Sequence, residues 1–165
     1  MGVSAGGIGV MAKTADSTGR GHPIGAGLSR IADELKSLRD RPAWSMNAAE
    51  TRDALVEAAR LAAAVAGLEA RIAGHARTVQ VEAESGATST ANWWAHATNQ
   101  TRAATHRKTK LATALALGVF EPVRVGLPGG RLLADQAQVI LAAVEALPDD
   151  LDAQIRSEAV ARLVG

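Results

Sequence analysis

Apolar residues recur at intervals of three and four along most of this chain, and that period constrains its fold more than any other feature. Leu28, Ile31, Leu35 and Leu38 show the spacing in one short segment, and it continues over several turns between residues 55 and 79. Such intervals place apolar side chains on one face of a helix, whereas a half-buried strand alternates with a period of two. The period therefore predicts amphipathic helices.

The composition favours the same fold class. Much of the 47% hydrophobic fraction is alanine, the residue that favours helix most. Aromatic residues make up only 2%, less than a β-sandwich or barrel usually needs. The length of 165 residues suits one domain with a core of its own. Because there is no cysteine, disulfides and thiolate metal sites are excluded. We expect an all-α, multi-helix bundle with a long central helix.

Glycine and proline divide the chain into segments. Half of the 16 glycines lie in residues 1–27, where no apolar period survives. We therefore expect a flexible N-terminal tail there and a helical domain over residues 28–165. Pro42 ends the first helix, because the residue before a proline avoids the helical region. Ser45 or Asn47 can cap the long helix, which we expect to reach about residue 84.

The middle of the chain shows the pattern of a helix-turn-helix unit. Ser89 or Thr90 can cap a short helix that carries both Trp93 and Trp94. A turn at residues 98–100 separates it from a second helix, capped by Thr101 and predicted to end at about Leu117. Two helices joined by a turn of three or four residues, with the second one basic, are typical of this motif.

The last third of the chain predicts three more helices. Pro122 can open a short one, and the glycine and proline residues of 127–130 indicate a turn. A longer helix should follow over about 133–146. Asp149 or Asp150 can cap the last helix after Pro148. The apolar side chains that we expect this helix to use are Leu151, Ile155, Ala159 and Leu163.

Charge is distributed unevenly although the net charge is only +1. No acidic residue lies between Glu84 and Glu121, whereas acidic residues predominate from Asp135 onward. Arg102, His106 and Lys110 are spaced four apart in the basic window, so they share one helix face, with Arg107 and Lys108 beside it. With no carboxylate near them in the sequence, these five residues are candidates to contact nucleic-acid phosphates. A plain solvated helix face is the alternative interpretation.

No motif in the chain indicates a catalytic centre. The four histidines, at positions 22, 75, 96 and 106, share no metal-ligand spacing, and no arrangement of Ser, His and Asp forms a recognisable triad. We therefore expect no enzyme activity, no cofactor, no metal and no small-molecule substrate. No apolar run reaches the length of a membrane span, and the N-terminus does not follow the pattern of a secretory signal. We expect a cytoplasmic protein without a membrane partner.

Four segments of the chain resemble a known family. Residues 86–93 (GATSTANW), 101–115, 136–140 (QAQVI) and 146–152 (ALPDDLD) are similar, in this order, to segments of the DUF222 or 13E12-repeat family of actinobacterial proteins. The resemblance extends from about Ser45 to Leu163. The chain departs from the family pattern at three positions, where relatives often have Glu, an aliphatic residue and Ser. These positions are Ala104, Thr109 and Leu133.

The resemblance implies a non-catalytic role. Many members are HNH endonuclease-like proteins in which a helical domain like this one precedes the nuclease module. The histidine and asparagine motif of that module does not occur here, so the resemblance implies a C-terminally truncated member. Its expected function is an accessory domain that contacts DNA through the basic helix of residues 101–117.

Two alternatives remain from the sequence. The alanine-rich stripe of the long helix, residues 47–84, favours close helix packing and could form a protein-interaction or homo-oligomer interface. The chain could also be an inactive fragment without DNA binding.

Overall fold

A computed structural model describes residues 21–148 and 150–165. The described residues divide into two compact units, residues 21–46 and residues 47–165. The division between the two units lies after Met46. Most of the predicted tail, residues 1–20, lies outside the described residues.

The first unit contains α1 (Pro23–Leu38) and a 3-10 turn, η1 (Ala43–Ser45). Helix α1 begins five residues before the predicted start at Leu28, so residues 23–27 are helical and are not part of a tail. Pro23 suits the first helical turn, where a backbone N–H would have no partner. The imidazole Nδ1 of His22 caps the helix by accepting the Ile24 N–H at 3.2 Å.

The long helix is α2 (Ala48–Thr78), and Asn47 caps it. The Asn47 side chain accepts the N–H of Glu50 at 3.0 Å, and the Glu50 carboxylate accepts the N–H of Asn47 at 2.7 Å, which forms a capping box. The predicted end at residue 84 is wrong, because Gln80 adopts the left-handed region with φ of 50°. The N–H of Val81 then reaches back to the carbonyl of Ala76, as in a Schellman motif.

Helices α3 (Thr90–Thr98) and α4 (Arg102–Ala114) form the predicted helix-turn-helix-like unit and pack against each other. Ser89 caps α3 and Thr101 caps α4 through their hydroxyl oxygens. Asn99 makes the turn between them with φ of 54°, a conformation that asparagine tolerates better than most residues. Helix α4 ends three residues before the predicted Leu117, and a second 3-10 turn, η2 (Gly118–Phe120), follows.

Three shorter helices complete the second unit: α5 (Glu121–Gly126), α6 (Ala134–Glu145) and α7 (Ala153–Val164). The predicted cap of α7 is wrong. The carboxylate of Asp152 accepts the Gln154 N–H at 2.7 Å and so caps the helix in place of Asp149 or Asp150. The predicted apolar face is also wrong, because Ile155 is 52% exposed whereas Val160 is fully buried.

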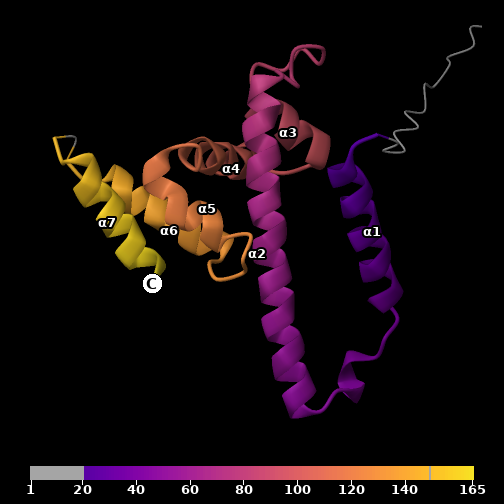
Figure 1. Ribbon diagram of the computed structural model, residues 1–165. Helices are drawn as coiled ribbons and strands as arrows, with labels where there is room; N and C mark the ends of the chain where they lie inside the picture. Colours follow the sequence, from indigo (N-terminus) through magenta and orange to yellow (C-terminus); the bar gives the residue numbers. More distant parts are fainter. Residues whose placement is uncertain (1–20, 149) are drawn as a thin grey trace, which may run out of the picture. The chain divides into compact units, whose positions relative to one another are not determined.

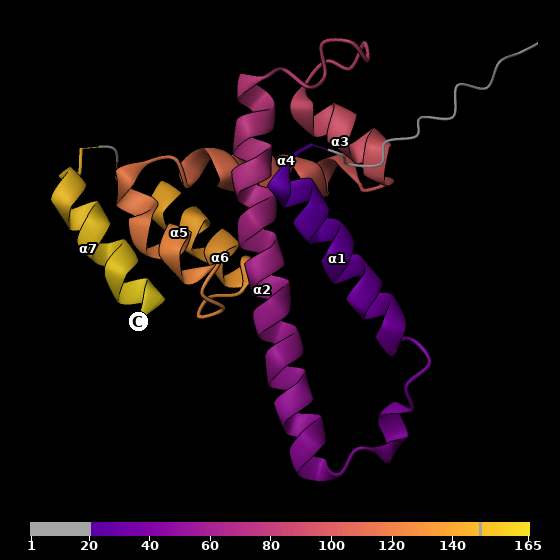
Figure 2. The same ribbon diagram turned by 45° about the vertical axis from the view of Figure 1, so that its right-hand side comes forward.

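The core of the second unit lies around α4, which packs against α2, α3 and α6 (Figures 1 and 2). Helix α7 packs against α5, α6 and η2. Helices account for all the regular secondary structure of the described residues, which confirms the all-α prediction. Among the described helices, none combines the length and the apolar content needed to cross a membrane. The largest fully buried side chains are those of Leu127, Val123, Val160 and Thr105.

Candidate nucleic-acid interface

One side of α4 faces solvent and carries most of the candidate cations. Thr105 and Leu111 are buried on the inner side of the helix, against the core. Arg102, His106 and Lys110 are exposed along the outer side, as their four-residue spacing predicts. The N-terminus of α4 and its middle turns therefore present positive charge on one surface.

His106 and Lys110 lie in a groove on the surface of the second unit. Arg107 and Arg77 also line this groove. The cavity has a volume of about 600 Å³. His106, Arg107 and Lys110 contribute to it from α4, and Arg77 contributes from the last turn of α2. The other lining residues, from the turn after α2, the start of α3 and the outer side of α4, are Glu82, Thr88, Ser89, Thr90, Ala91, Thr109 and Thr113. We call this concave surface the basic groove.

The hydrogen bonds of the groove hold its polar side chains in place. Arg77 donates from its guanidinium to the hydroxyl of Thr113 on α4, which fixes the end of α2 beside that helix. Thr90 donates to the carboxylate of Glu82 at 2.9 Å, so the acidic residue in the groove already has a partner. Among the described residues, Arg77, Arg102 and Arg107 form no ion pair. Their charge is therefore available to an anionic ligand.

The sequence did not indicate Arg77 as a candidate because this residue lies outside the basic window between Glu84 and Glu121. It stands near the end of a long helix, where a basic residue is ordinarily explained by the helix dipole. Its position in the groove results from the crossing of α2 and α4, which are far apart in the chain. The sequence signal nearest to Arg77 is the run Thr78–Val81, whose apolar and polar residues alternate as in a strand. This alternation departs from the helical period at the point where α2 ends.

Lys110 is paired with an acidic residue that is distant in the sequence. Its Nζ lies 2.6 Å from the carboxylate of Glu145 at the end of α6. The expectation that no carboxylate is near the basic helix is therefore wrong for this residue. Because the lysine side chain is 60% exposed, the pair is a weak one in water and can open toward a phosphate.

Lys108 is directed away from the basic groove, toward α2 and α3. Its Nζ lies 3.0 Å from the carboxylate of Glu69 and 5.2 Å from the ring centroid of Trp94. The lysine side chain is only 36% exposed. A cation held by a carboxylate and an aromatic ring stabilises the packing of three helices. The structure thus separates Lys108 from the other four candidates.

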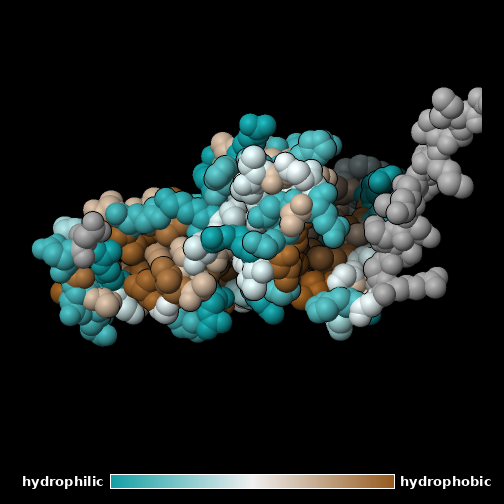
Figure 3. All heavy atoms as spheres, turned by 90° about the horizontal axis from the view of Figure 1, so that it is seen from above, coloured by the Kyte–Doolittle hydropathy of each residue, from teal (hydrophilic) through white to brown (hydrophobic). Residues whose placement is uncertain are grey.

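A second cavity of about 520 Å³ adjoins the basic groove, since Arg77, Lys110 and Thr113 line both. Its other walls are largely apolar and come from η2, α6 and the residues before η2. Figure 3 shows hydrophobic surface on the side of α6 and α7, bordered by hydrophilic residues. A ligand that follows α4 from the basic groove would thus meet an apolar surface. The apolar lining residues are Ala114, Leu117, Val119, Phe120, Leu141 and Val144.

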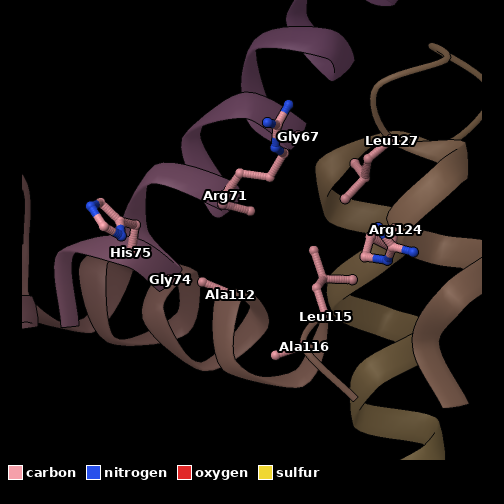
Figure 4. A pocket seen from close by; sticks show the side chains of 10 residues that line it. Gly67, Arg71, Gly74, His75, Ala112, Leu115, Ala116, Arg124 and Leu127 are labelled. Carbon is pink, nitrogen blue, oxygen red and sulfur yellow. The ribbon is translucent and has the colours of Figure 1, made fainter. Parts of the chain in front are cut away.

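A smaller cavity of about 280 Å³ lies between α2, α4 and α5 (Figure 4). Arg71 of α2 and Arg124 of α5 lie on facing sides, with Leu115, the residue directly after α4, between them. Arg124 already pairs with Glu121. His75 of α2 is a third basic residue of the lining, and the remaining lining residues are small or aliphatic.

Nowhere in residues 21–148 and 150–165 do three side chains of the metal-binding types come together as an ion site would require. Comparison with protein-family models, with curated proteins and with solved structures finds no match to this chain.

Proposed function

We propose that the chain is a non-catalytic domain that contacts DNA by binding the phosphate backbone in the basic groove. The observation that carries the proposal is the convergence of four basic side chains from two helices on one concave surface. Arg77 and Arg107 are the principal contacts, and Lys110 joins them when its pair with Glu145 opens. Neutralisation of phosphates by such side chains releases counterions and supplies most of the affinity of non-specific binding.

The groove suits a phosphate chain better than a single small anion. Its cations extend along α4, and its walls add hydroxyl groups of Ser89 and Thr88 that can donate to phosphate oxygens. Arg102, at the N-terminus of α4, continues the charge beyond the groove. Phosphate contacts position a protein on the duplex but do not read sequence, so we expect little sequence preference from these residues.

The proposal includes the role that the resemblance to DUF222 proteins implies. In that role the domain acts in the cytoplasm as an accessory part of an HNH endonuclease-like protein and holds DNA for a separate nuclease module. The structure of the groove supports the DNA contact, and the sequence resemblance alone supports the link to a nuclease. Lys108 is left out of the proposed contacts because Glu69 and Trp94 hold it.

Fluorescence anisotropy of a labelled DNA duplex, measured over a range of salt concentrations, tests the proposal. The wild-type chain should bind at low salt, and the logarithm of its association constant should fall with the logarithm of salt concentration with a slope of about −3, as for three to four phosphate contacts. The double variant Arg77→Gln/Arg107→Gln should bind more weakly and should reduce the magnitude of this slope by about 2.

A variant with the same loss of charge away from the groove provides the control. Arg52→Gln/Arg162→Gln removes two exposed arginines from α2 and α7 and should leave the slope nearly unchanged. If both double variants lost the same amount of DNA affinity, the groove would not be the contact surface. If the folded wild-type chain, checked by circular dichroism, does not bind at low salt, the proposed function is wrong.

A further inference from the structure

Helix α2 has two apolar faces, and the core of the second unit uses only one of them. The buried face consists of Ala63, Gly67, Ala70 and Ala73, and Ala70 and Ala73 belong to the core cluster. None of the residues from Ala48 to Ala62 is buried. A helix that is apolar on a second side needs a further partner to cover that side.

The second apolar face follows a heptad pattern. The spacings along it are four, three, four, three and four, which are the spacings of alternating d and a positions in a coiled coil. The buried residues Ala63 and Ala70 fall at f positions, which lie on the side of the helix opposite the a and d positions. We call this face the α2 seam, and it consists of Ala54, Ala58, Leu61, Val65, Leu68 and Ile72.

The seam contains exposed side chains of substantial size. Leu61 is 40% exposed, Val65 is 38% exposed and Ile72 is 39% exposed. Their chemistry also follows the coiled-coil pattern, since Val65 and Ile72 are β-branched at a positions whereas Leu61 and Leu68 stand at d positions.

We infer that α2 pairs through this seam with α2 of a second copy of the chain, in a two-fold symmetric, antiparallel coiled coil. An identical helix is a suitable partner because it presents the same heptad pattern. A two-fold interface needs a surface that is complementary to itself, and the charges beside the seam meet this requirement.

Charge complementarity determines the direction and the register. Glu57 and Arg71 stand at g positions, and g residues face each other across an antiparallel pair. When Leu61 packs against Val65 of the second copy, Glu57 lies beside Arg71 of that copy, and the symmetry repeats the pair. In a parallel pair, Glu57 would meet Ala62 and Arg71 would meet Ala76, so no ion pair would form.

The sizes of the side chains agree with this register. Leu68 packs opposite Ala58 of the second copy, and Ile72 packs opposite Ala54, so each large residue meets a small one. The flanking residues Ala62 and Ala64 meet their own equivalents and permit a close approach of the helices. Glu57 now pairs with Arg60 at 2.5 Å, but both side chains are more than half exposed, so the pair can exchange.

Analytical ultracentrifugation of the full chain over a concentration series tests the pairing. The chain has a mass of 17.0 kDa, and we expect twice this mass at high concentration. Val65→Lys places two charges at the centre of the seam and should leave only monomer. Val56→Lys is the matched control, because Val56 is 49% exposed on the same helix but lies off the seam, so it should still dimerise. A wild-type chain that remains monomeric would overturn the inference.

Charge reversal tests the direction. Glu57→Arg and Arg71→Glu should each raise the dissociation constant of the homodimer by about tenfold. An equal mixture of the two variants should form a heterodimer of wild-type affinity, because both ion pairs are then present, one in the original order and one reversed. If neither variant changes self-association, the antiparallel register is wrong. Circular dichroism of each variant should show an unchanged helix content.

Cysteine cross-linking gives an independent readout, since the chain contains no cysteine of its own. A mixture of Leu61→Cys and Val65→Cys should form a mixed disulfide under mild oxidation, and Val65→Cys alone should not cross-link efficiently. Efficient cross-linking of Val65→Cys with itself would indicate a parallel pair and would contradict the inference. DNA binding is measured separately in the basic groove, so the two proposals succeed or fail independently.

Discussion

Arg107 and Lys108 are adjacent on α4, and yet their surroundings give them different tasks. Consecutive residues of a helix point about 100° apart, so Arg107 lines the basic groove whereas Lys108 reaches back to α2. Glu69 and the ring of Trp94 hold the lysine, and its side chain covers part of that tryptophan. A charge in the sequence thus indicates a ligand contact only when the fold leaves it free.

The difference between these neighbours can be measured by replacing each with methionine, which keeps an unbranched side chain. Lys108→Met should lower the free energy of unfolding by about 1 kcal/mol, because it removes an ion pair and a cation–π contact. Arg107→Met should change stability by less than about 0.5 kcal/mol and should weaken DNA binding. Urea denaturation measures the stability of both variants, and fluorescence anisotropy measures their DNA binding. A loss of stability in Arg107→Met together with a loss of DNA binding in Lys108→Met would contradict the roles given to these two residues.

Within α2, two glycines one heptad apart are under different packing constraints. A Cβ atom at Gly67 would lie 3.0 Å from the backbone nitrogen of Pro128 and 3.1 Å from its ring. A Cβ atom at Gly74 would meet nothing closer than the carbonyl oxygen of Ala112, at 3.9 Å. Gly67 therefore permits the close approach of the turn after α5, whereas Gly74 leaves space beside α4.

Alanine substitutions should consequently have opposite effects at the two positions. Gly74→Ala should raise the free energy of unfolding by about 0.5 to 1 kcal/mol, since alanine favours helix and fits the space. Gly67→Ala should lower it by about 1 to 3 kcal/mol, because the proline ring and backbone cannot yield as a flexible side chain would. Thermal and chemical denaturation of both variants provide the test. A stabilised Gly67→Ala variant would show that the turn can move.

At the scale of the whole molecule, the cooperative core belongs to the second unit. Its contiguous cluster of buried residues extends from Ala70 on α2 to Val160 on α7. Helix α7 closes this core by packing on α5, α6 and η2. The inner face of α7 is the one that contains Val160, with Arg156 half-buried one turn before it.

The contribution of α7 to the whole core can be measured at Val160. Val160→Ala should lower the free energy of unfolding by about 1 to 3 kcal/mol, since the side chain is fully buried and its loss leaves a cavity. Ile155→Ala removes a larger side chain from the same helix but should cost less than about 0.5 kcal/mol, because that residue is 52% exposed. If Ile155→Ala costs more than Val160→Ala, the face of α7 has been assigned incorrectly.

Local chemistry in the sequence determined which segments are helical and where most of them begin. The apolar period, the alanine content and the caps at Asn47, Ser89 and Thr101 depend on residues within one or two turns of each other, so they can be read without knowledge of the fold. The same locality explains why Arg102, His106 and Lys110 were correctly placed on one face of α4.

Contacts between distant segments decided the rest. Arg77 reaches the basic groove, Glu145 pairs with Lys110, and Glu69 holds Lys108 only because α2 and α6 pack against α4. The face that α7 buries, with Val160 on it, likewise depends on how the helix packs against α5, α6 and η2. Periodicity reports which side chains share a face, but the partner of that face, and therefore which charges remain free, depends on tertiary packing.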